Sequence, residues 1–317
     1  MTETTKTIFE KYEIRKTKAQ KTAFISYIKS LAETYGYPCK MEKGWLGARN
    51  IIVGDPEKAK VIYTAHYDTC PRLPFPNFIT PRHLWIYLFY QIIIVLAIMI
   101  LPMVLTTAVV LILGDIMVWD DMVTETAALL VGYAVMVVCA LLILVGPANK
   151  HTANDNTSGV TVLTDLMAAM PEEYRDDAAY VFFDLEEVGL FGSGGFAAKH
   201  KKELANKPLV NFDCVSDGDT ILVTFQKGAV KYLEDLQAVF TDTDKIRTDI
   251  AVKGVFYPSD QANFRCGIGV AALKRTKKGN ILYMNRIHTK RDTVYMEENI
   301  AYLVDASVRL TRLLGEK

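Results

Sequence analysis

The chain has 317 residues, enough for one large α/β domain or two smaller ones, and half of them are hydrophobic. Its 36 basic and 36 acidic residues balance, and no basic face is interleaved with aromatic residues, so the composition excludes nucleic acid as an expected partner. Five dispersed cysteines without a C-x-x-C pair favour reduced thiols over a disulfide framework. Residues 1–21 are polar and charged and lack the apolar core of a signal peptide.

Apolar spacing and turn residues predict strands and helices that alternate along most of the chain. In chain order we expect a helix over 17–35, strands over 50–53 and 60–65, a helix over 160–170, a strand over 179–185, a helix over 189–202, strands over 209–215 and 221–225, a helix over 229–240, a strand over 270–273 and a helix over 297–314. This alternation predicts an α/β sandwich with a largely parallel sheet.

Residues 84–145 interrupt this alternation with two uncharged apolar stretches, 84–113 and 127–145. Each is long enough, as a helix, to cross a hydrocarbon core of roughly 30 Å. Pro102 is expected to kink the first, which a membrane helix tolerates. We therefore predict a transmembrane hairpin over 84–147, inserted into a discontinuous domain of residues 1–83 and 148–317. The alternative is a buried soluble hairpin used for dimerisation.

The charges that flank the two stretches predict their orientation. Arg72 and Arg82 precede the first and Lys150 follows the second, whereas the connection between them carries four acidic residues and no basic one. The positive-inside rule then places the large flanking segments in the cytoplasm and the short connection outside. The sequence thus predicts a protein of the cell membrane with two spans and a cytoplasmic catalytic domain.

Candidate chemistry lies where predicted strands end. His66 closes an apolar strand, and Asp68 shares its side of the pleat, where a carboxylate can hold the second ring nitrogen of a metal-bound histidine. Glu186 and Glu187 end a later strand, and sites in α/β sheets form at the carboxyl ends of strands.

Asp155, Asp213 and a second histidine, His288, complete the candidate set. Asp155 lies in a polar run, 151–159, that enters a predicted helix, with Thr157 and Ser158 as expected N-caps. Two histidines and several carboxylates, without cysteine, suit Zn²⁺.

Taken together, these residues resemble a known family. The motifs, in order, are His66-x-Asp68, Ala153-Asn154-Asp155-Asn156-x-Ser158-Gly159, Glu186-Glu187-x-Gly189-Leu190-x-Gly192-Ser193, Asp213, Ser259-Asp260 and His288-x4-Thr293. They are similar to those of the co-catalytic zinc metallopeptidases, metallopeptidase family twenty-eight, which include bacterial leucyl aminopeptidases, glutamate carboxypeptidase II and glutaminyl cyclase. The resemblance runs from about residue 50 to the C-terminus, except for the hairpin, and implies a three-layer sandwich with a mixed, largely parallel central sheet.

The resemblance also implies roles for individual residues. His66 and Asp213 would hold one Zn²⁺, Glu187 and His288 would hold the other, and Asp155 would bridge both. Glu186 would be the general base and Asp68 the partner of His66. The peptide bond between Asp155 and Asn156 is often cis in that family.

The activity implied is hydrolysis of a peptide with a free N-terminus by a water that two metal ions activate. Glu186 would take the proton of this water and return it to the leaving amine. A glutaminyl cyclase-like acyltransferase and an inactive receptor or scaffold on the same fold are the alternatives. Tyr257 and Asp260 are candidate substrate contacts. Tyr257 would stabilise the oxyanion that forms during hydrolysis. The chain departs from the family pattern at Leu185, where glycine is usual.

Overall fold

The buried strands of the chain pair into one mixed sheet in the computed structural model, which describes residues 1–279 and 281–317. The strands are β1 (Cys39–Lys43), β2 (Arg49–Val53), β3 (Val61–His66), β4 (Ala178–Phe183), β5 (Leu209–Phe212), β6 (Thr220–Phe225), β7 (Arg247–Ala251), β8 (Gly267–Arg275) and β9 (Leu282–Tyr283). Their order is β1-β2-β4-β3-β5-β8-β6-β7, and β9 pairs with β8. The central run β4-β3-β5-β8 is parallel, whereas β1, β2 and β9 join antiparallel and β6 runs antiparallel to β8.

Alternation along the central strands builds two apolar cores, one on each face of the sheet. In β3, Val61, Tyr63 and Ala65 enter the larger core, while Ile62 enters the other. Helices α1 (Glu3–Tyr12), α2 (Lys18–Thr34), α6 (Gly159–Ala169), α8 (Leu233–Val239) and α9 (Glu297–Gly315) contribute to the larger core, and α7 (Phe191–Lys199) covers the opposite face. The predicted three-layer α/β architecture is confirmed.

Strands β1, β7 and β9 and helix α1 were not predicted. The edge strands β1 and β7 each bury a single residue, which leaves mostly polar side chains along them, as is usual for exposed sheet edges. Strand β9 has only two residues, too few to show a period. The helix predicted over 229–240 is in fact a 3₁₀ turn, Lys227–Tyr232, followed by the shorter α8.

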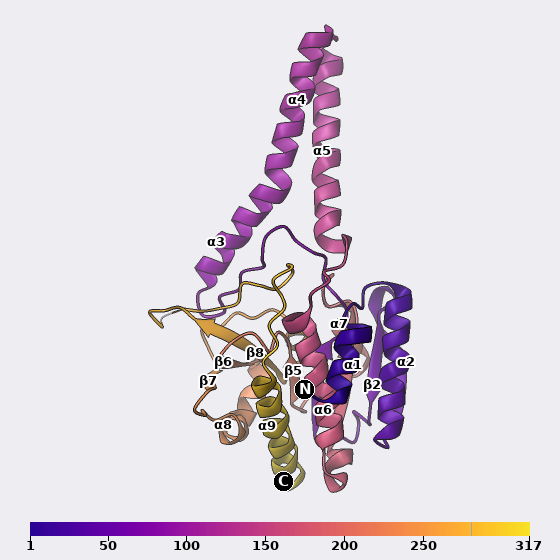
Figure 1. The fold of residues 1–317 in the computed structure, drawn as a ribbon, viewed down its shortest axis with the longest axis vertical. Helices are drawn as coiled ribbons and strands as arrows, with labels where there is room; N and C mark the ends of the chain where they lie inside the picture. Colours follow the sequence, from indigo (N-terminus) through magenta and orange to yellow (C-terminus); the bar gives the residue numbers. More distant parts are fainter. Residues whose placement is uncertain (280) are drawn as a thin grey trace.

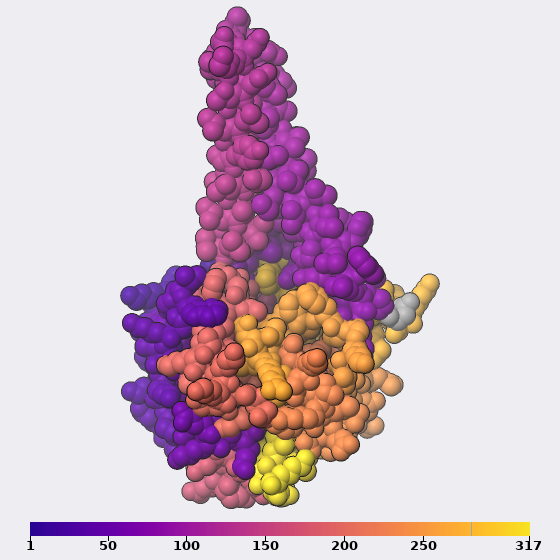
Figure 2. Space-filling model, turned by 180° about the vertical axis from the view of Figure 1, so that it is seen from behind, coloured from indigo at the N-terminus to yellow at the C-terminus, as the bar shows by residue number. Residues whose placement is uncertain are grey.

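A helical hairpin projects from the α/β unit as a narrow column (Figures 1 and 2). Its first limb runs through α3 (Leu84–Val95), a π-helical turn (Leu96–Ile100) and α4 (Leu101–Met117), and its second is α5 (Asp121–Val145). The wide turn lies directly before Pro102, whose ring has no N–H and crowds the preceding turn of an α-helix. The second limb begins earlier than predicted because the carboxylate of Asp120 caps it, accepting from the N–H groups of Met122 and Val123.

Small residues let the two limbs approach closely. A Cβ at Gly132 would lie 2.3 Å from the hydroxyl of Thr107, and one at Gly114 would lie 2.2 Å from a methyl of Thr124. Such glycine and threonine contacts are typical of helix pairs that associate in lipid. Both limbs are long and apolar enough to cross a membrane, and 6% and 11% of their most apolar stretches are buried.

The chain leaves the α/β unit and returns to it at the same place. Pro71 and Ala148 form an antiparallel bridge, and the N–H of Arg72 donates to the carbonyl of Pro147 at 2.8 Å. The N–H of Asn149 donates to the carbonyl of Cys70 at 3.0 Å. The hairpin is therefore an excursion whose two ends are joined by main-chain hydrogen bonds.

A buried ion pair anchors α2 to the turn after β4. The ammonium of Lys21 contacts the carboxylate of Asp184, and their side chains are 9% and 3% exposed. The other oxygen of Asp184 accepts from the N–H of Arg49 at 3.0 Å, and its first oxygen also accepts from the N–H of Leu185. Asp184 thus holds the main chain that leads into Glu186.

We predict that Lys21→Met destabilises the fold by about 3–5 kcal/mol, because the substitution leaves the charge of Asp184 buried without a cationic partner. Urea unfolding followed by circular dichroism measures this change. Lys29→Met is the matched control on the same helix, because Lys29 forms an exposed pair with Glu33 at 3.9 Å and should change stability by under about 1 kcal/mol. Equal effects of the two substitutions would contradict the assigned role.

Candidate active site

The predicted site residues converge at the carboxyl ends of the parallel strands, on the side from which the hairpin projects (Figure 1). His66 ends β3, Glu186 and Glu187 follow β4, and Asp213 follows β5. Loops before α6 and before α9 add Asp155 and His288. These six side chains line one pocket of about 270 Å³, together with Asn77, Ile79, Leu190, Cys214, Tyr257, Pro258 and Ile287.

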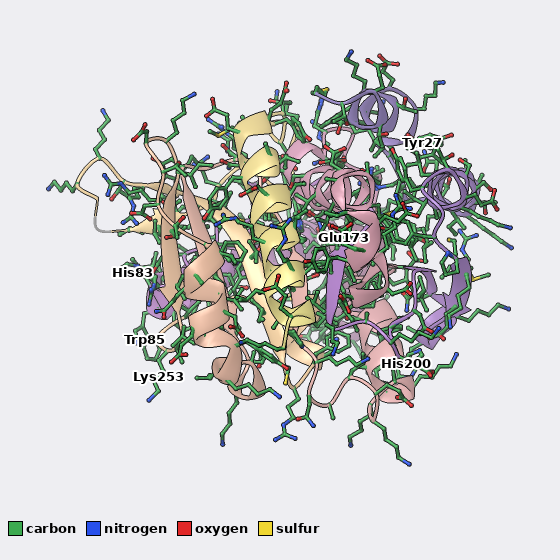
Figure 3. All side chains as sticks on the ribbon, turned by 90° about the horizontal axis from the view of Figure 1, so that it is seen from below. Tyr27, His83, Trp85, Glu173, His200 and Lys253 are labelled. Atoms are coloured by element: carbon green, nitrogen blue, oxygen red, sulfur yellow. The ribbon has the colours of Figure 1, made fainter. Side chains whose placement is uncertain are left out.

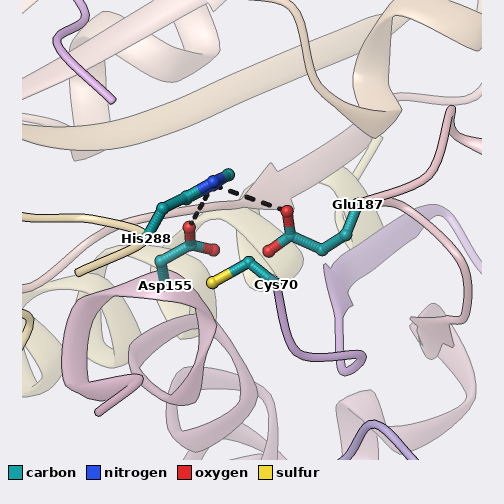
Figure 4. A group of neighbouring side chains, drawn as sticks. All are labelled: Cys70, Asp155, Glu187 and His288. Carbon is teal, nitrogen blue, oxygen red and sulfur yellow. Dashed lines mark ion pairs between the residues drawn. The ribbon is translucent and has the colours of Figure 1, made fainter. Parts of the chain in front are cut away.

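Asp155 lies at the centre of this pocket, and its two oxygens face different histidines. Oδ1 is 3.3 Å from Nε2 of His66, whereas Oδ2 is 3.1 Å from Nε2 of His288. The same His66 nitrogen lies 3.5 Å from Asp213, and the same His288 nitrogen lies 3.5 Å from Glu187, as Figure 4 shows for the second group. Two groups of metal-ligand side chains therefore share one carboxylate.

Hydrogen bonds from main-chain N–H groups to a side-chain carboxylate fix the loop that carries Asp155. The carboxylate of Asp292 accepts from the N–H groups of Asn154 at 2.8 Å and of Asp155 at 3.0 Å. The peptide bond between Asp155 and Asn156 is cis, as the resemblance implies. Asp292 lies in the run that also carries His288, so it connects the two loops of the site.

Ser158 occupies the N-cap position of α6, as expected, but neither it nor Thr157 makes a capping hydrogen bond. The hydroxyl of Ser158 donates to the carbonyl of Asn154 at 2.6 Å, and that of Thr157 pairs with Thr152. The amide oxygen of Asn156 instead accepts from the N–H of Gly159 at 3.1 Å and from the N–H of Cys214 at 3.2 Å. Asn156 takes this place because the chain makes its tight turn one residue before the predicted caps, and it thereby joins α6 to the end of β5.

Asp68 supports both His66 and the glutamate pair. Its Oδ1 lies 3.5 Å from Nδ1 of His66, the ring nitrogen that faces away from Asp155. Its two oxygens accept from the N–H groups of Glu186 at 3.1 Å and Glu187 at 3.3 Å. The two hydrogen bonds fix the turn after β4, and the same carboxylate lies where it can orient the ring of a metal-bound histidine.

The site concentrates negative charge in a buried volume. Burial and, after it, neighbouring carboxylates raise the pKa of Glu186 and of Glu187 well above the usual range. Burial alone would lower the pKa of His66, but the surrounding carboxylates, with Glu186 first, raise it well above its ordinary value. Each of these shifts favours either bound protons or another cation among the carboxylates.

The donor set fits metal ions. Three groups of ligand atoms each lie within 4.8 Å of one another: those of His66, Asp155 and Asp213, those of Asp155, Glu187, His288 and Cys70, and those of His66, Glu186 and Glu187. Oε1 of Glu187 is buried and has no hydrogen-bond partner among the described residues. Imidazole and carboxylate donors at this spacing suit zinc.

Four residues in or beside the pocket have left-handed backbone conformations. They are Leu185 with φ 57°, Leu190 with φ 59°, Cys214 with φ 56° and His288 with φ 61°. This conformation costs a residue with a side chain roughly 1–2 kcal/mol, and such costs concentrate at functional sites. It gives a physical reason why glycine, rather than leucine, suits the position of Leu185.

The two predicted substrate contacts differ in whether a substrate in the pocket can reach them. Tyr257 lines the pocket, but its hydroxyl donates to the main-chain oxygen of Asp213 at 3.0 Å, so contact with an oxyanion requires this hydrogen bond to break. Asp260 is fully buried and is not among the lining residues, so it can act on a substrate only through its neighbours. Burial, before any neighbouring charge, raises the pKa of Asp260 to about 7.

Two residues that the sequence did not single out lie at this site. Cys70 lies beside Asp155, although we expected a centre without cysteine (Figure 4). The feature of the sequence that could have indicated Cys70 was its position two residues after Asp68. Arg15 is fully buried and donates to the carbonyls of Tyr67 and Tyr12 and to the hydroxyl of Thr157. No local pattern could reveal it, because two of its three partners, Tyr67 and Thr157, are distant in sequence.

Other histidines lie away from the site. In Figure 3, His83 lies at one edge of the α/β unit and His200 at another. His200 is 9% exposed and pairs with Glu42 at 3.1 Å. His151 is exposed.

The sequence model of peptidase family M28 matches residues 135–303, just over half of the chain. A search of curated proteins found no match. Among solved structures, the Legionella pneumophila LapA aminopeptidase is similar, with 14% identity, a TM-score of 0.57, and coverage of 99% of this chain and 70% of that one.

Two further solved structures have the same fold. The Porphyromonas gingivalis glutaminyl cyclase has 13% identity and a TM-score of 0.54 and covers 98% of both chains. A leucine aminopeptidase precursor from Bacteroides thetaiotaomicron has 12% identity and a TM-score of 0.53, covering 96% of this chain and 93% of that one. At such identities the likeness is one of fold.

We predict that His288→Ala and Asp213→Ala each lower the zinc content of the purified protein, measured by mass spectrometry of the metal, and that chelators remove the remainder. His151→Ala is the control, because His151 is exposed and belongs to none of the groups. Wild-type zinc content in both site variants would contradict the assigned ligands.

Proposed function

The chain belongs to peptidase family M28, and from this premise we propose that it is a membrane-anchored aminopeptidase that uses two zinc ions. The observation that carries the proposal is the position of Asp155, whose two oxygens face His66 and His288 separately. His66 and Asp213 would hold one ion, and Glu187 and His288 the other, with Asp155 shared.

The bound ions would supply Lewis acidity, lowering the pKa of water and polarising the scissile carbonyl. Glu186 is the general base of the proposal, because its carboxylate lines the pocket beside Glu187. A carboxylate in this place can take a proton from water and return it to the leaving amine. Asp68 holds the ring of His66 and the main chain of Glu186 in place throughout.

The shape and charge of the pocket support a substrate with a free N-terminus. An α-amine is cationic, and the carboxylates that line the pocket favour a cation. A volume of about 270 Å³ suits one residue at the end of a peptide rather than a long internal segment. Ile79, Tyr257 and Ile287 supply apolar lining beside the charged groups.

Glu186→Gln is predicted to lower kcat by roughly 10²–10⁴ while zinc content stays at the wild-type level, because the amide cannot accept the proton of water. Release of the N-terminal residue from unblocked peptides measures the rate, with N-blocked peptides as a negative control. Activity within about tenfold of wild type would remove Glu186 from this role. Cyclisation of N-terminal glutamine without peptide cleavage would instead identify an acyltransferase.

The hairpin supports anchoring in a bilayer. Leu84–Met117 and Asp121–Val145 expose most of their apolar side chains, and exposing these to water would cost far more than a net stability of about 5–15 kcal/mol. Asn77 and Ile79 of the pocket belong to the segment that leads into the first limb. The pocket would then lie near the membrane surface, and the basic flanks would place it in the cytoplasm. Its substrates would be cytosolic peptides or the cytosolic ends of membrane proteins.

We predict that a cysteine introduced at Asp120, in the connection, reacts with a membrane-impermeant thiol reagent in intact cells. A cysteine at Lys201, which is exposed on the α/β unit, should react only after permeabilisation. The unmodified chain measures the background from its own cysteines. The reverse pattern would place the active site outside, and release of the protein by carbonate would exclude the spans.

A further inference from the structure

Cys70 is held at the junction between the pocket and the hairpin. It follows β3 by four residues, is fully buried, and its carbonyl accepts from the N–H of Asn149 at 3.0 Å. The neighbouring Pro71 pairs with Ala148 on the returning chain. These main-chain contacts therefore fix the place from which the Cys70 side chain extends.

The side chain of Cys70 lies beside Asp155 and Glu187, with its sulfur on the Asp155 side (Figure 4). One ligand atom from each of these three residues and from His288 lies within 4.8 Å of the other three. Nε2 of His288 is 3.1 Å from Asp155 and 3.5 Å from Glu187. Donors bound to one tetrahedral zinc ion are separated by about 3.3–3.8 Å, given metal–ligand distances of about 2.0–2.3 Å. The group is therefore close to the size of a single metal shell.

A second observation points to a ligand in this group. Oε1 of Glu187 has no hydrogen-bond partner among the described residues, although the side chain is only 5% exposed. Figure 4 shows the carboxylate of Glu187 turned toward Asp155 and the sulfur of Cys70. A buried carboxylate oxygen without a donor is costly unless a cation meets it. The unsatisfied oxygen and the sulfur thus face the same space.

We propose that Cys70 is a ligand of the metal ion held by Asp155, Glu187 and His288. This inference rests on the proposed two-metal site and adds a donor to one half of it. The ion would bind the thiolate, and the thiol proton would pass to solvent. The half formed by His66, Asp155 and Asp213 has no cysteine within the described groups.

The added sulfur makes the two halves chemically different. Cys70, Asp155, Glu187 and His288 would supply four protein donors to one ion, the number typical of tightly held zinc. His66, Asp155 and Asp213 would supply three to the other, which would leave room for water or substrate, as is typical of a catalytic zinc. A thiolate also favours zinc over magnesium and manganese, which prefer oxygen donors.

Cobalt substitution tests the proposal without using peptidase activity. The purified full-length protein is stripped with a chelator and loaded with Co²⁺, and its near-ultraviolet spectrum is recorded for the sulfur-to-cobalt charge-transfer band. We expect this band in the wild type and in Cys214→Ser, and its loss in Cys70→Ser. Cys214 is the matched control, because it is buried and lines the same pocket but belongs to none of the candidate groups.

Zinc affinity provides the second measurement. Cys70→Ser should weaken the binding of one of the two ions by at least about tenfold in a chelator competition. Cys70→Asp should retain that ion without the charge-transfer band, because it replaces the donor but not the sulfur. Circular dichroism confirms that each variant is folded.

The outcomes separate this inference from the proposed function. A wild-type protein that binds two Co²⁺ ions without the band overturns the role of Cys70 and leaves the two-metal site intact. A band that persists in Cys70→Ser overturns it as well. A folded wild-type protein that binds no metal overturns both.

Discussion

The mutual repulsion of buried carboxylates around His66 is the constraint on which the rest of the structure depends. Burying like charges together is unfavourable unless cations offset them, and the raised pKa values of Glu186 and Glu187 reflect that cost. At the edge of the site, a side-chain cation offsets this repulsion, because Lys21 pairs with Asp184. At the centre no lysine or arginine among the described residues pairs with Asp155, which leaves that position to histidines and to the proposed metal ions.

The scaffold keeps these groups together by fixing their main chains. Parallel strands bring β3, β4 and β5 to one edge, and hydrogen bonds from Asp68, Asn156 and Asp292 then hold the loops that follow. Left-handed residues beside the pocket add a local cost of roughly 1–2 kcal/mol each, which the packed core on both faces of the sheet can absorb. The geometry of the site is therefore a property of the whole sheet.

Strand and helix alternation predicted the α/β fold, and the rule that sites form at the carboxyl ends of strands predicted that His66, Glu186 and Glu187 meet. The places of Asp155 and His288, which lie on loops before helices, followed from the resemblance to a known family. The sequence was insufficient where side chains meet partners distant in the chain. Arg15 binds main-chain atoms near β3, and Cys70 enters the site through the turn that begins the hairpin. The polar edge strands β1 and β7 were equally hidden, since an exposed edge needs no apolar pattern.

The position of the hairpin also constrains the order in which the chain can fold during synthesis. β3 pairs only with β4 and β5 among the described strands, and both are made after the hairpin, so the first part of the chain emerges from the ribosome with β1 and β2 as its only pairable neighbours. The six buried residues of β3 have no partner strand until the hairpin and the strands after it have been made. Synthesis of the hairpin therefore precedes completion of the sheet, and a chain delayed between β3 and β4 would expose a strand suited to aggregation.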